Sequence, residues 1–220
     1  MPVRADAASG AGTLHCAGAS RAEIVSFDDS PPPPGASPWV GGRAPATGIR
    51  ITDPDSFWPR CYDELAGRIR GALGWRVLRL EHVGSTSVPG LPAKPVIDID
   101  LTVADSGREQ DYVPALAAAG FALKVREPWW HGHRMLEAAG PASNLHVFGP
   151  GSPELVKHRI FRDWLRGNPG ERELYAAAKR AAADRANALG EHGMQYNARK
   201  QEVIREIYHR AFVAAGLLPD

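Results

Sequence analysis

The segment Val96 to Val103, with the sequence VIDIDLTV, restricts the possible folds of this chain more than any other part. Successive side chains of a β-strand point to opposite faces of the sheet. Asp98 and Asp100 therefore share one face with Val96 and Thr102, and the isoleucines, the leucine and Val103 share the other. The alternation predicts a strand with one face on an apolar core and two carboxylates on its other face.

Two carboxylates this close repel each other, and burying them without a cation or a base is costly. One interpretation is that Asp98 and Asp100 share a divalent cation. The alternative is that their face of the strand meets solvent, as in a half-exposed antiparallel strand. The strand pattern alone leaves both open.

A small-residue turn precedes this strand. Gly84, Ser85 and Thr86 follow an expected strand over residues 77–83, and twelve residues separate Ser85 from Asp98. The glycine permits a tight turn, and the amides and hydroxyls after it can bind phosphate oxygens. Such turns are common after strands, so only the combination with the aspartate pair indicates a phosphate-binding site.

The remaining periodicities predict an α+β fold, with mixed strands followed by a helical run. A helix that Asp55 or Ser56 caps should end at Gly74. The other expected helices cover residues 111–119, 152–165, 168–189 and 194–215, and the other expected strands cover residues 121–126, 133–137 and 145–148.

The first 48 residues differ in composition from the rest. They hold seven prolines, four of them in the run Pro31 to Pro34, and seven glycines, with few large apolar side chains. Such a segment buries too little apolar surface to offset its ordering entropy, so we predict a flexible tail over residues 1–48 and a domain over residues 49–216. Alternatives are a polyproline ligand at Pro31 to Pro34 and a short strand at residues 23–27 that docks on the domain.

The charge balance excludes one class of protein. With 26 basic and 25 acidic side chains, the chain is not a nucleic-acid binder that works through bulk positive charge. It has no apolar run long enough to span a membrane and no secretory-signal pattern, so we expect a cytoplasmic location. Cys16 and Cys61 are too few for a disulfide framework.

Longer stretches resemble the GrpB family (UPF0157), whose fold is similar to that of nucleotidyltransferases. They extend over roughly residues 50–212: HVGSTSVPGLPAKPVIDIDLTV, REPWWHGHRML, NLHVFGPGSPELVKHRIFRDWLRGNP, ELYAAAKR and YNARKQEVIREI. The resemblance implies a nucleotidyltransferase-like mixed sheet with flanking helices and a helical C-terminal part. It also implies that Gly84, Ser85 and Thr86 hold phosphates, and that Asp98 and Asp100 hold Mg²⁺.

The chain departs from the superfamily pattern at the third carboxylate, which a later strand usually supplies. The segment NLHVF offers His146 and no acid. A neutral imidazole suits a metal ligand or a general base, so we predict His146 as a catalytic residue. The alternative is an ordinary hydrogen-bonded strand histidine. Glu127 and Glu137 are the spare acids nearby.

Basic residues indicate contacts to a triphosphate or an anionic substrate. Lys157 and Arg162 belong to a helix crowded with charge, on which His158 and Arg159 lie between them. Lys94 comes just before the aspartate strand. The family resemblance favours Tyr196 and Lys200 as nucleotide contacts, since residues four apart share a helix face. The alternatives are a solvated basic face and an ordinary surface pair.

The segment around Trp130 offers substrate contacts. Trp129 and Trp130 can stack on a ring, although tryptophans also pack cores. His131 and His133 would share one face of an extended segment, and Arg134 follows. A zinc site would need further ligands at a recognisable spacing, so we predict substrate contact or a structural role.

Together these features predict a Mg²⁺-dependent transferase that uses ATP or another nucleoside triphosphate to modify or activate a small-molecule acceptor, for example a carboxylate on its way to an amide or ester. A second hypothesis is a catalytically silent module that binds a nucleotide or a partner, and a third is a metal-dependent hydrolase that uses Asp98, Asp100 and His146. The expected partners are the nucleotide and the acceptor, without membrane or nucleic acid. The acceptor, the nucleotide preference and the oligomeric state stay open.

Overall fold

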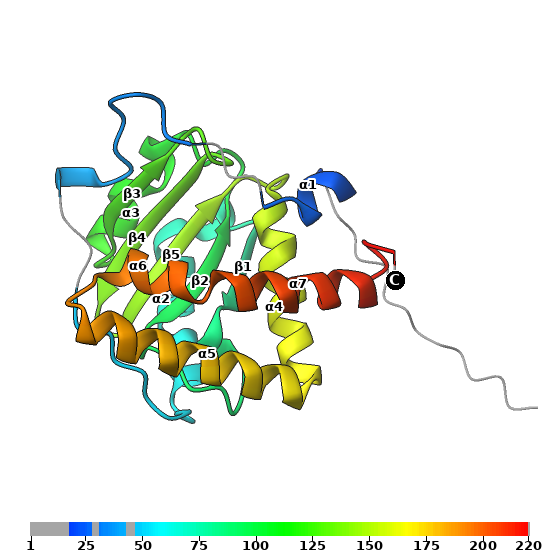
Figure 1. The fold of residues 1–220 in the computed structure, drawn as a ribbon. Helices are drawn as coiled ribbons and strands as arrows, with labels where there is room; N and C mark the ends of the chain where they lie inside the picture. The colour runs from blue at the N-terminus through cyan, green and yellow to red at the C-terminus, as the bar shows by residue number, and fades with distance from the viewer. Residues whose placement is uncertain (1–17, 28–30, 43–46, 220) are drawn as a thin grey trace, which may run out of the picture.

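A five-stranded mixed sheet forms the centre of the protein (Figure 1). The computed structural model describes residues 18–27, 31–42 and 47–219. The strand order is β1-β2-β5-β4-β3; β2 and β5 run parallel and the other neighbours antiparallel. The strands are β1 (Arg79–Val83), β2 (Ile97–Thr102), β3 (Ala122–Glu127), β4 (His133–Ala139) and β5 (Ala142–Phe148).

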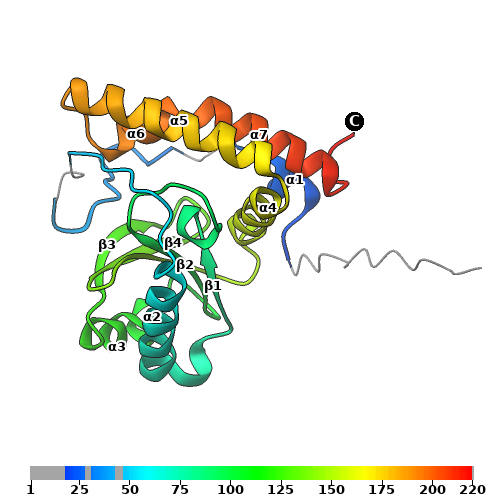
Figure 2. The same cartoon turned by 90° about the horizontal axis from the view of Figure 1, so that it is seen from below.

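Helices flank this sheet, which confirms the predicted α+β class. One face packs on α2 (Trp58–Leu73) and α3 (Val113–Ala118), and there Ile97, Ile99 and Leu101 of β2 are at most 2% exposed. The C-terminal part is helical and consists of α4 (Pro153–Gly167), α5 (Pro169–Ala188), α6 (Gly193–Arg199) and α7 (Gln201–Ala214). Figure 2 shows the sheet between these C-terminal helices and α2.

Two expected helix boundaries were wrong. The cap predicted at Asp55 or Ser56 lies before the helix: α2 begins at Trp58, and the Asp55 carboxylate accepts the N–H of Phe57 in the preceding turn. The single last helix is in fact two, because the backbone of Lys200 (φ −103°, ψ 1°) leaves the helical region between α6 and α7.

Two stretches of the expected flexible tail are folded onto the domain. In α1 (Arg21–Val25), Ile24 is 1% exposed and packs among side chains of α4 and α7, and the ring of Phe27 lies 5.3 Å from that of Tyr208. The segment that docks is thus a helix and not the short strand considered above.

The second stretch, residues 31–42, lies along the edge strand β3. Trp39 forms a β-bridge with Val125, and the N–H of Arg126 donates to the carbonyl of Pro38 at 2.9 Å. The tail prediction is therefore wrong for both stretches, because apolar side chains hold the first on the domain and backbone pairing holds the second. Residues 1–17, 28–30 and 43–46 lie outside the described residues, and the polyproline-ligand interpretation stays untested.

Among the helices in the described ranges, none combines the length and the apolar character needed to cross a membrane.

Candidate functional site

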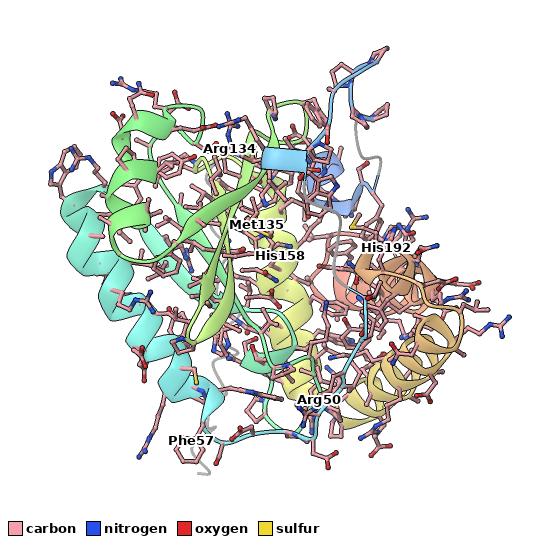
Figure 3. All side chains as sticks on the ribbon, turned by 90° about the vertical axis from the view of Figure 1, so that its left-hand side faces the viewer. Arg50, Phe57, Arg134, Met135, His158 and His192 are labelled. Carbon is pink, nitrogen blue, oxygen red and sulfur yellow. The ribbon has the colours of Figure 1, made fainter. Side chains whose placement is uncertain are left out.

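A cavity of about 780 Å³ lies on the polar face of β2. This volume is typical of a small-molecule site. Figure 3 labels two of the lining residues, Met135 from β4 and His158 from α4, in the interior of the molecule. The predicted site residues that line the cavity are Gly84, Ser85, Lys94, Asp98, Trp130, His133, His146, Tyr196 and Lys200.

The small-residue turn and the aspartate strand meet at one point of this cavity. Gly84 has a positive φ of 66°, and a Cβ atom at this position would overlap the carboxylate of Asp98. Only glycine allows the turn to lie against the carboxylate in this way. Ser85 lines the cavity beside it. Thr86 does not: it is buried, and its hydroxyl lies 3.0 Å from Nε2 of His82, so its placement gives no support to a phosphate contact.

Asp98 is an ionised carboxylate on the cavity wall. Nδ2 of Asn144, its register partner on β5, donates to Oδ1 of Asp98 at 2.9 Å. Burial by itself would raise the pKa of Asp98, but the protonated form of His146, the Asn144 amide and the positive charge of Lys94 outweigh it and hold the pKa below its usual value. Asp98 therefore carries a negative charge at neutral pH.

Asp100 has a different environment. Its side chain is 1% exposed, and Nδ1 of His158 lies 2.9 Å from Oδ2 and 3.1 Å from Oδ1. Burial by itself would lower the pKa of His158, but the charge of Asp100 and this hydrogen bond raise it to about 9. His158 is thus an imidazolium at neutral pH. The solvent-facing alternative considered above is wrong for Asp100.

The predicted Mg²⁺ ligands are a pair of carboxylates, and His158 binds one of them, Asp100. Within the part of the chain that the structure describes, no group of three or more His, Cys, Asp or Glu residues could hold a metal ion. The imidazolium of His158 occupies the position beside Asp100 that a cation would take. Magnesium stays a prediction, and it would require His158 to leave Asp100. The spare acid Glu137 does not line the cavity.

Three side chains on neighbouring strands form a hydrogen-bonded chain that ends in the cavity. Glu127 Oε2 lies 2.7 Å from His133 Nδ1, and His133 Nε2 lies 3.0 Å from His146 Nδ1. Burial lowers the pKa of His133, which favours its neutral form. A neutral His133 that donates to Glu127 must accept the proton of His146 Nδ1. The lone pair of a neutral His146 then lies on Nε2, 3.9 Å from Asp98 Oδ1.

Three lysines gather around two tyrosines at another part of the wall. The Nζ atoms of Lys94 and Lys200 lie 5.3 and 5.2 Å from the ring centre of Tyr196, and Nζ of Lys179 lies 5.0 Å from that of Tyr175. None of the three lysines forms an ion pair with a described carboxylate, whereas Lys157 on α4 is paired with Glu154. The charge of Asp98 acts on Lys94 and Lys179, but no carboxylate of the described residues is in ion-pair contact with the three ammonium groups. A cluster of this kind favours an anion.

Lys179 is the residue of this cluster that the sequence analysis missed. It is 3% exposed, and its Nζ donates to the carbonyl of Pro92 at 2.6 Å. Burial, followed by the charge of Lys200, lowers the pKa of Lys179 to about 7. The available signal was a Tyr175/Lys179 pair four residues apart on an alanine-rich helix, which puts both on one face.

Four predicted contacts lie away from the cavity. Lys157 is held by Glu154 at 2.6 Å, and Arg162 donates to Asp163 at 2.7 Å and to the carbonyl of His82 at 3.1 Å. Arg134 donates to Glu109 at 2.8 Å. Each has a carboxylate partner of its own. His131 is exposed and does not line the cavity either.

A comparison with family models matches residues 48–210 to the family described as "GrpB protein". The chain belongs to the GrpB family. A solved GrpB protein from Enterococcus faecalis has the same fold, with a TM-score of 0.66 and 26% identity over 75% of this chain and 98% of that chain.

Two relatives are more similar to this chain in sequence than the solved GrpB protein is. A UPF0157 protein of Halalkalibacterium halodurans is 45% identical over 74% of this chain and 82% of its own length. A UPF0157 protein of Streptomyces coelicolor is 41% identical over 80% of this chain and 90% of its own length. A protein of Mycolicibacterium paratuberculosis named dephospho-CoA kinase is 34% identical over 77% of this chain, which spans 47% of that protein.

Proposed function

We propose that this GrpB protein is a nucleotidyltransferase-like transferase that uses ATP or another nucleoside triphosphate to modify or activate a small-molecule acceptor. The observation that carries the proposal is the group of Lys94, Lys179 and Lys200, without carboxylate partners and on the same cavity as the Gly84–Ser85 turn. A triphosphate supplies the several negative charges that such a group needs.

The lysines would hold the phosphate chain, and Ser85 would add a hydroxyl donor from the turn. The acceptor attacks the α-phosphorus and forms a new phosphorus–oxygen or phosphorus–nitrogen bond. The bond from the α-phosphorus to the bridging oxygen breaks, and pyrophosphate leaves with the electron pair. The lysines stabilise the negative charge that grows on pyrophosphate.

His146 is placed to receive a proton. A carboxylate acceptor attacks without losing one, whereas a hydroxyl or an amine gives its proton to Nε2 of His146, which the Glu127–His133 pair leaves as the acceptor nitrogen. The ionised Asp98, 3.9 Å away, stabilises the imidazolium that results.

A relative's name adds limited support. A kinase transfers a phosphoryl group, so a relative named dephospho-CoA kinase agrees with a nucleotide site, although the match spans 47% of that protein. The product distinguishes the two reactions, because a nucleotidyltransferase releases pyrophosphate and a kinase releases a nucleoside diphosphate.

The ion pair of His158 and Asp100 favours a second candidate, the catalytically silent module that binds a nucleotide or a partner. With Asp100 held by His158, one of the two carboxylates predicted for catalysis is occupied. Such a module would bind ATP and release no product from it.

Calorimetric titration with ATP and with inorganic tripolyphosphate, each with and without Mg²⁺, tests the binding step. A pyrophosphate assay against a library of carboxylic acids, alcohols and amines tests the chemistry. The transferase should release pyrophosphate with at least one acceptor, and Asp98→Asn should abolish this while leaving the fold intact. Asp184→Asn, a matched change at an exposed aspartate of α5, should have no effect.

Binding of ATP without product release would favour the silent module. Absence of tripolyphosphate binding would contradict the transferase and the nucleotide-binding form of the silent module. Full turnover in Asp98→Asn would refute the mechanism.

A further inference from the structure

The cavity has a wall that lies outside the family region. The match to the GrpB model begins at residue 48, yet Pro31, Pro32, Pro38 and Trp39 line the cavity. The β-bridge of Trp39 with β3 and the hydrogen bond to the carbonyl of Pro38 hold this stretch against the sheet. The segment therefore adds a surface to the cavity that the family region does not supply.

Other side chains that line the cavity are aromatic or apolar. Val125, Met135 and Phe148 come from the sheet, and Trp129 and Trp130 come from the turn between β3 and β4. The ring centre of Trp130 lies 6.1 Å from that of Phe148. Together with Trp39 and Pro38 they form what we call the aromatic subsite.

The Trp39 end of the aromatic subsite lies far from Lys94. Trp39 and Val125 lie at the edge strand β3, and Phe148 on β5 lies nearer the centre of the sheet. Lys94 comes just before β2 and close enough to Asp98 for their charges to interact. In the order β2-β5-β4-β3, three strand spacings separate β2 from β3, which corresponds to about 14 Å. A ring held at the Trp39 end of the subsite is therefore separated from a phosphate group beside Lys94.

Two polar groups that line the cavity beside the aromatic subsite are paired with each other. The Glu127 carboxylate and the His133 imidazole bind each other at 2.7 Å. A nucleobase has several polar edge atoms that lose water on binding and need new partners. An apolar ring has no such requirement and gains from stacking and burial.

We infer that the aromatic subsite binds an aromatic ring of the acceptor, and that residues 31–42 determine which acceptor this chain takes. The inference rests on the proposed function, because it assigns the other end of the cavity to the nucleotide. The acceptor is then a ring-bearing carboxylic acid, alcohol or amine, with its reactive group directed toward His146 and Asp98.

Indole serves as the probe of the subsite, with tripolyphosphate and ATP as probes of the phosphate end. In the full chain labelled with ¹⁵N, added indole should shift the side-chain N–H signals of Trp39 and Trp130. It should leave the signal of Trp75, which is 81% exposed and does not line the cavity, unchanged. This measurement needs no variant.

Variants then test the contribution of the N-terminal wall. Trp39→Ala should weaken indole binding by about 5- to 150-fold, the range measured for loss of one stacking partner. Trp39→Phe should restore most of the affinity, and the matched control Trp75→Ala should keep all of it. The affinities for tripolyphosphate and ATP should stay within about twofold in every variant, since the lysines are untouched.

Two results would overturn the inference. The first is unchanged indole binding in Trp39→Ala together with no shift at Trp39 in the wild type. The second is a loss of ATP affinity in Trp39→Ala with unchanged tripolyphosphate affinity, which would assign the subsite to the base of the nucleotide. Failure of the wild type to bind tripolyphosphate would refute the proposed function but not the indole result, so the two failures are distinguishable.

Discussion

Replacement of Lys179 by methionine should stabilise the protein and impair its anion site at the same time. Burial lowers the pKa of Lys179 from its ordinary 10.5 to about 7. At about 1.4 kcal/mol per pH unit, the buried amine costs the folded state about 4 kcal/mol at pH 7. Methionine removes this cost but leaves the carbonyl of Pro92 without its donor, which costs about 2 kcal/mol. We expect the free energy of unfolding of Lys179→Met to exceed that of the wild type by about 2 kcal/mol at pH 7.

The advantage of the variant depends on pH with a definite sign. Between pH 7 and 10.5 the unfolded chain holds the Lys179 proton and the folded chain has lost it, so the wild type gains stability from this group as pH rises. At pH 9 the cost of the buried amine falls to about 2 kcal/mol, and the variant and the wild type should be equally stable. Below pH 7 the full difference should persist.

Urea unfolding at pH 6, 7 and 9 measures these differences, and sulfate, whose charge is constant over this range, measures anion binding. Lys179→Met should bind sulfate at least tenfold more weakly, and wild-type binding should fall as pH rises through 7. Arg180→Met, at the next, exposed position of α5, should change stability by less than about 0.5 kcal/mol. Destabilisation by Lys179→Met at pH 7, or wild-type sulfate affinity in this variant, would refute the reasoning.

Three further changes test other parts of the structure. Gly84→Ala should destabilise the protein by about 2 kcal/mol or more in urea unfolding, because φ is +66° and the added methyl group meets Asp98; a neutral effect would contradict this packing. Ile24→Ala should cost about 2 kcal/mol and speed amide exchange in α1, since the side chain is 1% exposed; unchanged exchange would show that α1 does not depend on this contact. Glu127→Gln should mix the tautomers of His146 in ¹⁵N NMR spectra, whereas the wild type should show the proton on Nδ1; a proton on Nε2 of the neutral wild-type ring would contradict the hydrogen-bonded chain.

The polar face of β2 could be predicted because its information is local. Alternation with period two assigns Asp98 and the isoleucines to opposite faces whatever surrounds the strand. The contact between Gly84 and Asp98 also lies within one stretch of the sequence, although only the structure shows that a Cβ atom would not fit there. The α+β class followed in the same way from periodicity.

Ligand contacts that were predicted from the positive charge of side chains were less reliable than faces predicted from the period of a strand. The basic helix α4 carries several cations, and the sequence did not indicate which one faces the sheet. His158 faces the sheet and binds Asp100, whereas Lys157 and Arg162 pair with carboxylates close to them in the sequence. Composition likewise predicted a tail, whereas Ile24 packs in an apolar cluster with α4 and α7 and Trp39 forms a β-bridge with β3.

The aspartate strand, the turn before it and most of the helices and strands could be read from the sequence, since each depends on residues within a few positions of one another. The groups that meet in the cavity could not, because they come from distant parts of the chain. His158 is paired with Asp100 across 58 positions of the chain, Lys179 with Pro92 across 87, and Trp39 with the edge strand β3. Such contacts depend on the packing of whole elements, and packing also sets the burial that shifts the pKa of Lys179 and leaves the three lysines in need of an anion.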